Sequence, residues 1–289
     1  MNQSITPTVV TGSAAQVPSD LASQLGIEIL PLEIYVNGKE YLDGIDITPS
    51  DLYQKMRNEN VNVKTAAPSV GQYFECFKTI LEQGEREILC ITLSNKLSSD
   101  YVSAVSAANM AQEELQTAKV TVFDSFAATA PQGFLAIEAA HRLHRGESME
   151  TVVSYLSTAR QRTGFLAALD TLSYLSQGGR IGKAASLVGN ALQIKPILTL
   201  KDGIVAPETI VRTEDRIMSR ITSIVKQKTE GRQKLRLSVM HADALKRAKR
   251  LRKMLLELDP SIEIPILEFT PVMGAHAGPG LVGVGYYYE

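Results

Sequence analysis

The sequence has little cysteine, which argues against a disulfide framework or a zinc site. It contains two cysteines in 289 residues, Cys76 and Cys90, and no Cys-x-x-Cys or zinc-like spacing joins them. Cys76 falls in a helical pattern and Cys90 in a strand pattern, and free cysteine is usually buried. We therefore expect both to be reduced core residues of a cytoplasmic protein, because disulfides are rare in that compartment.

An excess of charge of either sign is also missing. The 30 basic residues balance 31 acidic ones, for a formal net charge of −1. Such a balance gives no electrostatic footprint for nucleic acid or for an anionic membrane surface. A basic stretch between positions 235 and 258 alternates with leucines, which is typical of a solvated helix face. We expect no nucleic-acid partner.

Long apolar runs are absent as well. No run approaches the roughly 20 residues needed to span a bilayer, so we expect no integral membrane segment. The first residues, "MNQSITPTVVTGS", lack the basic and apolar regions of a signal peptide. Both observations favour a cytoplasmic location.

Common enzyme and cofactor motifs are missing too. There is no Gly-x-Gly-x-x-Gly after a strand, no P-loop and no Gly-x-Ser-x-Gly elbow. No cluster of His, Cys and Asp has the spacing of metal ligands. The sequence predicts neither a cofactor nor a metal.

What is present, up to about residue 160, is an alternation of strand and helix patterns. "TPTVVTGS", "IEILPLEIYV", "EILCITLS" and "KVTVFDS" read as strands, with helices between most of them. Asn37-Gly38 is a hairpin signal, and Thr48, Pro49 and Asp51 resemble a helix-capping box. Such alternation predicts a largely parallel sheet covered by helices on both faces.

Beyond about residue 160 the pattern changes. Short helices and a double glycine come first, followed by a hairpin signal at Asp202-Gly203 and a long helix over residues 213–229. A strand, a helix and a further strand follow. We therefore predict two α/β domains, residues 1–160 and residues 161–289.

Hydroxyl side chains gather after two of the predicted strands. Thr65 lies in "KTAAPS", which we expect to be a loop feeding a helix capped by Ser69. Ser94 and Ser98 lie in "LSNKLSSDY", between a strand and a helix. Since carboxyl ends of parallel strands lie side by side, Thr65 and Ser98 could converge on an anion at helix N-termini. The alternative is that these residues are only caps and turn residues.

Two further stretches carry a polar side chain beside glycines. His276 lies in "GAHAGPG", where it could donate a hydrogen bond to an anion, act as acid or base, or be a structural turn residue. Arg180 follows a double glycine in "SQGGRIG", where it could bind phosphate, a carboxylate or a partner protein, or be a surface charge. A hydrolase or acyl transferase using Ser98 and His276 is geometrically open, but spacing identifies no acidic residue to orient the His.

These stretches together resemble the DegV family of bacterial fatty-acid-binding proteins. The similarity runs along nearly the whole chain, and the order of its short elements makes it specific. The elements that match are "TGSAAQVP" (weakly), "YLDG", "TAAPS", "LSNKLSSDY", "FDS", "LSYLSQGGRIG", "KPIL" and "HAGPG".

The resemblance implies two unlike α/β domains, a three-layer largely parallel one and one with a mixed sheet and helices, with a long-chain fatty acid held between them. The acyl chain would lie in an apolar tunnel that the second domain closes. The carboxylate would be bound by Thr65 and Ser98, with His276 and Ser94 near it. Some members present the acid to a fatty-acid kinase, so the resemblance implies a binding protein rather than an enzyme.

Several positions depart from the family pattern. Gly12 stands where the family has Asp, Ala66 and Ala67 replace Ser-Gln, and Ser99-Asp100 replaces Gly-Thr. We expect Asp100 to lie in the first turn of its helix, facing away from the anion and stabilising the helix N-terminus. Because Thr65 and Ser98 remain, binding is the inference that the residues support best.

Physical chemistry favours a clamp over a nucleophile at the hydroxyl cluster. Neutral hydroxyls position a carboxylate by charge-assisted hydrogen bonds without a tight ion pair. At roughly 0.8 kcal/mol per buried CH₂, a 16-carbon tail contributes about 11 kcal/mol before the cost of association. We expect Arg180 and Arg212 to flank the tunnel opening and to dock a partner such as the kinase. A regulatory sensor that docks its partner only when loaded is a further hypothesis.

Overall fold

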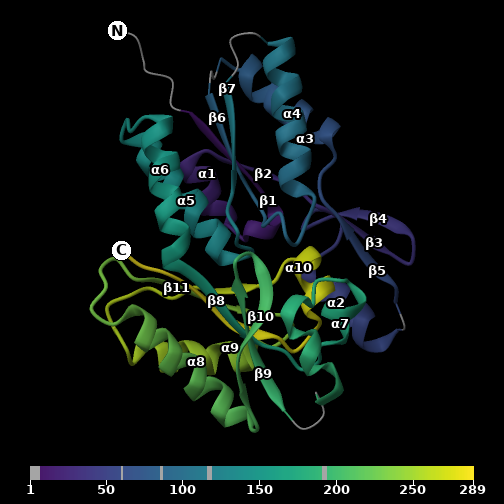
Figure 1. The fold of residues 1–289 in the computed structure, drawn as a ribbon. Helices are drawn as coiled ribbons and strands as arrows, with labels where there is room; N and C mark the ends of the chain where they lie inside the picture. Colours follow the sequence, from purple (N-terminus) through teal and green to yellow (C-terminus); the bar gives the residue numbers. More distant parts are fainter. Residues whose placement is uncertain (1–6, 60, 85–86, 116–118, 191–193) are drawn as a thin grey trace.

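Within the described residues, the strands form three β-sheets (Figure 1). A computed structural model describes residues 7–59, 61–84, 87–115, 119–190 and 194–289. A four-stranded sheet has the order β2-β1-β6-β7, a six-stranded sheet the order β10-β9-β8-β13-β11-β12, and a three-stranded sheet the order β4-β3-β5. All strand pairs in the first sheet are parallel, whereas the six-stranded sheet is mixed. The predicted fold class, a largely parallel α/β part followed by a mixed sheet with helices, is confirmed.

Helices cover both faces of the parallel sheet. Its strands are β1 (Thr8–Gly12), β2 (Ile27–Leu30), β6 (Glu87–Thr92) and β7 (Lys119–Asp124). In β6, Ile88 and Cys90 pack on one helical layer and Leu89 and Ile91 on the other, as the two-residue period of a strand dictates. The first layer is α3 (Val70–Glu82) and α4 (Asp100–Glu114); the second is α5 (Ala130–His144), flanked by α1 (Ser19–Leu25) and α6 (Met149–Ala159) (Figure 1).

The two cysteines are free and differ in burial. Cys90 is fully buried in β6, and Cys76 is half-buried in α3. Burial raises the pKa of the Cys76 thiol to about 12. Both thiols are therefore held in the unreactive protonated form.

The sequence prediction of a single strand over residues 27–36 is wrong. The structure divides this segment into β2, in the parallel sheet, and β3 (Glu33–Val36), in the three-stranded sheet. Pro31 lies at the break, where its missing N–H and fixed φ interrupt a strand ladder. The chain thus passes from the four-stranded parallel sheet into the three-stranded sheet at this point.

Local turn and cap signals form as predicted. The β3–β4 hairpin turns at Asn37 and Gly38, whose φ angles are 52° and 83°, and β4 is Lys39–Leu42. The helix α2 (Pro49–Asn58) begins at a complete capping box between Thr48 and Asp51. Both signals rely on side chains close in sequence, which explains why they can be predicted without tertiary structure.

The mixed sheet contains the last strand of the chain in its interior. Its strands are β8 (Thr163–Ala168), β9 (Lys195–Lys201), β10 (Ile204–Val211), β11 (Arg236–His241), β12 (Ile266–Glu268) and β13 (Val282–Tyr287). Strand β13 pairs antiparallel with both β8 and β11. The helices α8 (Glu214–Thr229) and α9 (Leu245–Leu256) cover one face, and β9 and β10 turn at Asp202-Gly203 as predicted.

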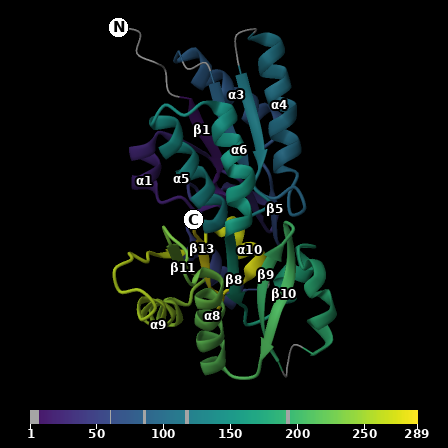
Figure 2. The ribbon, with the colours of Figure 1, turned by 60° about the vertical axis from the view of Figure 1, so that its left-hand side comes forward.

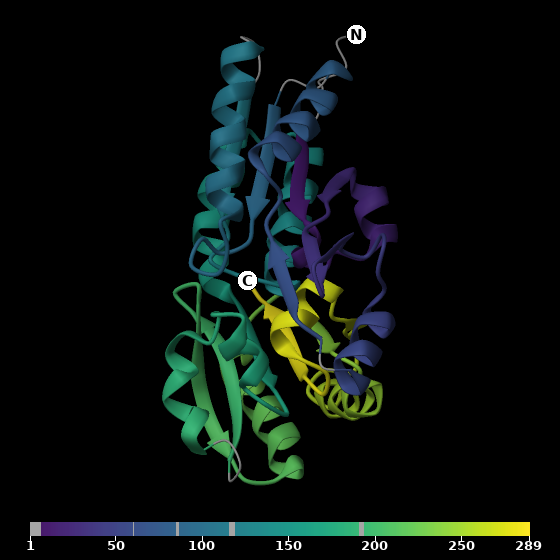
Figure 3. The ribbon, with the colours of Figure 1, turned by 90° about the vertical axis from the view of Figure 1, so that its right-hand side faces the viewer.

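The other face of the mixed sheet packs toward the parallel sheet. One hydrophobic cluster runs from Val9 of β1 through α5 to Tyr287 of β13. Two short helices, α7 (Ser173–Gln177) and α10 (Pro271–Ala277), lie at this junction, and the yellow α10 can be followed in Figures 2 and 3. The 3₁₀ segments among the described residues are Ser13–Ala15, Arg160–Arg162 and Gly182–Asn190. The proposed boundary near residue 160 falls between α6 and β8.

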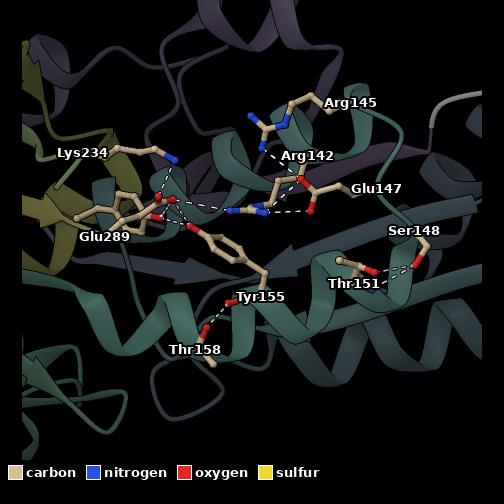
Figure 4. A network of polar contacts seen from close by, with 10 residues as sticks. Arg142, Arg145, Glu147, Ser148, Thr151, Tyr155, Thr158, Lys234 and Glu289 are labelled. Carbon is tan, nitrogen blue, oxygen red and sulfur yellow. Dashed lines mark hydrogen bonds and ion pairs between the residues drawn. The ribbon is translucent and has the colours of Figure 1, made fainter.

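A polar network joins the half that contains the parallel sheet to the half that contains the mixed sheet (Figure 4). Glu289 accepts hydrogen bonds from Tyr155 of α6 (2.5 Å) and Tyr287 of β13 (2.9 Å), and it forms an ion pair with Lys234. The Arg142 guanidinium of α5 lies 3.3 Å from the centre of the Tyr155 ring. Although burial opposes it, the bonds from Lys234 and the two tyrosines lower the pKa of Glu289 to about 2.

Candidate functional site

A cavity of about 330 Å³ lies where the three sheets meet. Most of its lining is apolar, with leucines from both halves and Phe165 and Phe269, whose ring centres are 6.2 Å apart. The polar lining residues are Thr65, Ser98, Ser99, Thr129, Arg180, Thr199 and His276. An apolar cavity with a few polar groups suits an amphipathic ligand.

Thr65 reaches the cavity from a strand, not from the loop that its sequence context predicted. It belongs to β5 (Val63–Ala66) and pairs with Ile34 of the antiparallel three-stranded sheet. Pro68 restricts only Ala67, which lies beyond the end of β5, so the strand is formed by the pairing of residues 63–66 with β3. The predicted route to convergence, through the carboxyl ends of adjacent parallel strands, is therefore wrong for Thr65. Ser69 is a helix cap, with a complete capping box to Gln72.

His276 comes from the last turn of α10, where the sequence predicted a glycine-rich turn. Its Nε2 lies 2.8 Å from the Thr65 hydroxyl oxygen, although 211 residues separate the two. Burial, and secondarily the charge of Arg180, lowers the pKa of His276 to about 4. The ring is therefore neutral at physiological pH.

The surroundings of His276 favour one tautomer. Its Nδ1 is buried and has no hydrogen-bond partner among the residues that the structure describes. A buried donor without a partner is rarer than a buried acceptor without one, so we assign the proton to Nε2. The ring then donates to the Thr65 oxygen, and the Thr65 hydrogen remains free to donate into the cavity.

Ser98, another residue of the cavity wall, has a similar arrangement. It precedes α4, and its hydroxyl oxygen accepts a hydrogen bond of 3.2 Å from the backbone N–H of Asp100. Its single hydrogen is left for another acceptor. The cavity thus receives two hydroxyls, each with its oxygen already engaged and its hydrogen available.

Arg180 lies on the cavity wall and bonds to the backbone. Its Nε donates to the carbonyl of Leu97 (2.9 Å), and its Nη1 donates to the carbonyl of Gly178 (2.7 Å). The first bond crosses from the mixed-sheet half to the loop that carries Ser98. A guanidinium here adds positive charge to the polar end of the cavity.

The structure does not bring Ser94 or Arg212 to the cavity wall. Ser94 is fully buried, and its hydroxyl donates to the carbonyl of Gly203 at the turn of the β9–β10 hairpin (2.9 Å). Arg212 is exposed and follows Val211, which pairs with Lys195 at the far end of that hairpin. Strand β10 has 8 residues, so this end is roughly 25 Å from the turn.

Asp100 lies in the first turn of α4, as expected, and is not among the residues lining the cavity, but its side chain is fully buried. One carboxylate oxygen accepts from the backbone N–H of Leu93 (2.9 Å) and the other from the Tyr73 hydroxyl (2.7 Å). Burial raises the pKa of this carboxyl above its usual value. Because the first turn of α4 packs on α3, which carries Tyr73, position 100 points inward.

Features expected of a Ser/His hydrolase are not assembled in the described part of the chain. His276 bonds to Thr65, and no carboxylate bonds its Nδ1 there. Residues 7–59, 61–84, 87–115, 119–190 and 194–289 contain no group of three or more His, Cys, Asp and Glu residues arranged to hold a metal. Within the same ranges, no helix combines the length and apolar character needed to cross a bilayer.

Other lining residues gave no distinct signal in the sequence. Phe165 and Leu281 alternate like ordinary strand and core residues, so their pattern cannot distinguish a cavity wall from a packed core. Thr129 caps α5 with a φ of 58°, which a β-branched residue rarely adopts. Such an angle is fixed by tertiary packing and has no local sequence signature.

The chain is similar to known proteins over nearly its whole length. The family profile of DegV, described as an uncharacterised protein, matches residues 7–289. A DegV domain-containing protein of Clostridium acetobutylicum is 32% identical over 284 residues, covering 97% of each chain. One from Halalkalibacterium halodurans is 30% identical over 281 residues, covering 97% of this chain and 98% of the relative.

Solved structures resemble the whole chain. A DegV family protein of Thermus thermophilus, described by its fatty acid binding, has 31% identity and a TM-score of 0.90, with coverage of 98% of this chain and 99% of that one. DegV of Bacillus subtilis, described as a fatty acid binding protein, has 26% identity and a TM-score of 0.90 over 99% and 100% of the chains. A stearic acid-binding protein of Eubacterium ventriosum has 26% identity and a TM-score of 0.90, with 98% coverage of both.

Proposed function

The chain belongs to the DegV family, and from this premise we propose that it binds one long-chain fatty acid. The carboxylate accepts hydrogen bonds from Thr65 and Ser98, and the acyl chain occupies the apolar cavity. One observation carries the proposal: two hydroxyls lie on the wall of an apolar cavity, the Ser98 oxygen accepting from the backbone N–H of Asp100 and the Thr65 oxygen lying 2.8 Å from His276 Nε2. With the proton of His276 assigned to Nε2, both hydroxyl hydrogens are free to donate. Such a pair is complementary to a carboxylate, which only accepts hydrogen bonds.

The ligands of similar proteins support the ligand class. The relatives from Thermus thermophilus, Bacillus subtilis and Eubacterium ventriosum are described as fatty-acid-binding, the last with stearic acid. All three share the fold of this chain along nearly its full length. A linear saturated or monounsaturated acid is therefore the first ligand to test.

The energetics suit a carrier that gives up its ligand. Burying the tail of a 16-carbon acid contributes about 11 kcal/mol, before association costs of several kcal/mol. The head group meets neutral hydroxyls and a neutral His276, while Arg180 has two donors engaged by backbone carbonyls. Affinity thus comes mainly from the tail, and the carboxylate stays accessible to chemistry performed by a partner.

The direct test is the identity of the bound lipid. Protein purified from cells is extracted with organic solvent and analysed by mass spectrometry, and delipidated protein is titrated with palmitate and oleate. We expect about one fatty acid per chain and recovery of binding after delipidation. A lipid-free preparation that also fails to bind either acid would contradict the proposal.

A measurement of acyl-ester turnover distinguishes the binding protein from the alternative, an acyl hydrolase or transferase. The alternative would use Ser98 as nucleophile and His276 as base, and would therefore release acid from acyl esters. The binding protein should show no turnover of such esters, and Ser98→Ala should weaken palmitate binding. Ester hydrolysis that disappears in Ser98→Ala would favour the enzyme.

We further propose that the loaded protein presents its carboxylate to a partner enzyme, of which a fatty-acid kinase is the first candidate. Arg180 is the proposed docking residue, since it lies at the polar end of the cavity. A regulatory sensor would instead bind its partner only when loaded. Pull-downs of the kinase with delipidated and reloaded protein distinguish the two, because only the sensor requires the acid for docking.

A further inference from the structure

The loop that carries Ser98 is held at both of its ends by a single residue. It connects β6 to α4 over residues 93–99. At its start, the N–H of Leu93 donates to the Asp100 carboxylate (2.9 Å); at its end, the N–H of Asp100 donates to the Ser98 hydroxyl (3.2 Å). The Asp100 side chain therefore fixes where the loop leaves the strand, whereas the contact to the Ser98 oxygen is made by the backbone N–H of position 100.

The environment of Asp100 is unusual for a carboxylate. It is 0% exposed, and none of the ion pairs in the described part of the chain includes it. Its second oxygen accepts from the Tyr73 hydroxyl of α3, which limits its rotation. Buried carboxylates are normally paired with a cation, because desolvation is costly. Because Asp100 has no cation as partner among the described residues, its burial has to be explained by the groups to which it is hydrogen-bonded.

Stabilisation of the helix N-terminus does not account for these contacts. An acid in the first turn stabilises a helix through the free N–H groups of that turn. The Asp100 carboxylate bonds instead to Leu93, which precedes the helix by seven positions, and to a side chain of α3. Its hydrogen-bonding capacity is directed to the loop.

We propose that Asp100 is a positioning residue for the carboxylate-binding hydroxyl of Ser98. This inference rests on the proposed function, since it assigns Asp100 a role in binding an acid. The side chain holds Leu93 at the start of the loop and thereby places Ser98 where the backbone N–H of position 100 engages its oxygen, which leaves the Ser98 hydrogen for the cavity. Tyr73 keeps the carboxylate in the conformation that does this.

A double-mutant cycle between Asp100 and Ser98 tests the proposal. The variants are Asp100→Asn, Ser98→Ala and the double variant, each delipidated and titrated with palmitate and with hexadecanol, which has the same tail but no carboxylate. We expect Asp100→Asn to weaken palmitate binding by about tenfold and to change hexadecanol binding less than twofold. In the Ser98→Ala background, Asp100→Asn should have almost no further effect, because its route to the ligand is gone.

Tyr73→Phe is the milder companion in case Asp100→Asn folds poorly. It removes only the hydroxyl that restrains Asp100 and should lower the palmitate-to-hexadecanol affinity ratio in the same direction by a smaller factor. The proposal would be overturned if Asp100→Asn weakened palmitate and hexadecanol binding equally, or if its effect added to that of Ser98→Ala in the double variant. A palmitate-to-hexadecanol affinity ratio that stays constant or rises in Tyr73→Phe would also overturn it. If wild-type protein binds neither ligand, the proposed function itself fails, and that outcome is distinct from the others.

Discussion

At the scale of single residues, the polar end of the cavity depends on which atoms donate. A carboxylate offers only acceptors, so a hydroxyl helps it only when the hydroxyl hydrogen is free. Thr65 and Ser98 meet this condition by the same means, an N–H donor on the oxygen, supplied by a His ring in one case and by the backbone in the other. The N–H donors are thus as much part of the site as the hydroxyls.

We expect Thr65→Val to lower palmitate affinity by about 10- to 100-fold, the value of a hydrogen bond to a charged group. Valine keeps the branched shape and suits strand β5, so the loss reports the hydroxyl. Isothermal titration of delipidated protein is the measurement. Thr65→Ser, which keeps the hydroxyl, is the matched control and should bind nearly as wild type. Equal weakening in both variants would show that Thr65 acts through packing.

His276 makes the stability of the delipidated protein depend on pH. Its pKa is about 4 when folded and about 6.5 when unfolded, so protons bind preferentially to the unfolded state as pH falls between these values. The stability contributed by the neutral ring is present above pH 6.5 and falls by about 3 kcal/mol toward pH 4. Urea unfolding from pH 7 to pH 4.5 should show this loss.

His276→Gln is the control for that titration. Glutamine can still donate to Thr65, but it does not titrate, so the difference in unfolding free energy between the two proteins should shrink or reverse as pH falls. Comparing the two proteins removes the contributions of buried carboxyls such as Asp43 and Asp124, whose raised pKa values act in the opposite direction. Parallel pH profiles would show that His276 is not buried as a neutral ring.

At the scale of elements, two hairpins with the same local chemistry have different tertiary roles. Gly38 and Gly203 each follow a residue with positive φ and have φ angles of 83° and 77°. A side chain at Gly38 would meet open space, whereas one at Gly203 would overlap with the Ser94 hydroxyl. The β9–β10 turn therefore supports the loop that carries Ser98, and the β3–β4 turn supports only its own hairpin.

This difference predicts unequal effects of the same substitution. Gly38→Ala should cost about 1 kcal/mol of unfolding free energy, the strain of an L-residue in the left-handed region. Gly203→Ala should cost this amount and roughly 1–3 kcal/mol more, because it also displaces the buried Ser94 hydroxyl from its partner. Denaturant unfolding gives both values. Palmitate affinity should fall only in Gly203→Ala; an equal fall in both would exclude a role for the Ser94–Gly203 contact.

The sequence allowed local structure to be predicted better than contacts between distant helices and strands. The hairpin at Asn37-Gly38 and the cap at Thr48 were predictable because their chemistry lies within a few residues. Thr65 and Ser98 were paired from the strand pattern and again by family resemblance, and both line the cavity, yet the expected geometry was wrong for Thr65, because β5 joins an antiparallel sheet. The inward turn of Asp100 was missed, since burial depends on how α4 packs on α3. Contacts between distant elements have no local signature.

At the scale of the whole molecule, the two halves meet at the polar end of the cavity. The mixed-sheet half contributes Arg180, whose Nε bonds to the Leu97 carbonyl, and the Gly203 carbonyl, which accepts from Ser94. The loop of residues 93–99 is thus held by its own half and by the other. A partner that acts on the carboxylate has to approach this junction, and a cation there is a suitable contact for an acidic partner surface.

Arg180→Ala should therefore separate ligand binding from use of the ligand by a kinase. The loop of residues 93–99 keeps its contacts to Gly203 and Asp100 in this variant, so palmitate affinity should change by less than about threefold. Acyl-phosphate yield with a partner kinase should fall about tenfold or more, in the range of interface arginines. Arg212→Ala is the matched control, because Arg212 is exposed at the far end of the β9–β10 hairpin and should affect neither quantity. The two measurements are titration of delipidated protein and acyl-phosphate formation at saturating acid. Proportional losses of both in Arg180→Ala would mean that Arg180 binds the ligand or supports the loop through Leu97, and a loss of yield in Arg212→Ala would move the docking surface to the other end of the mixed sheet.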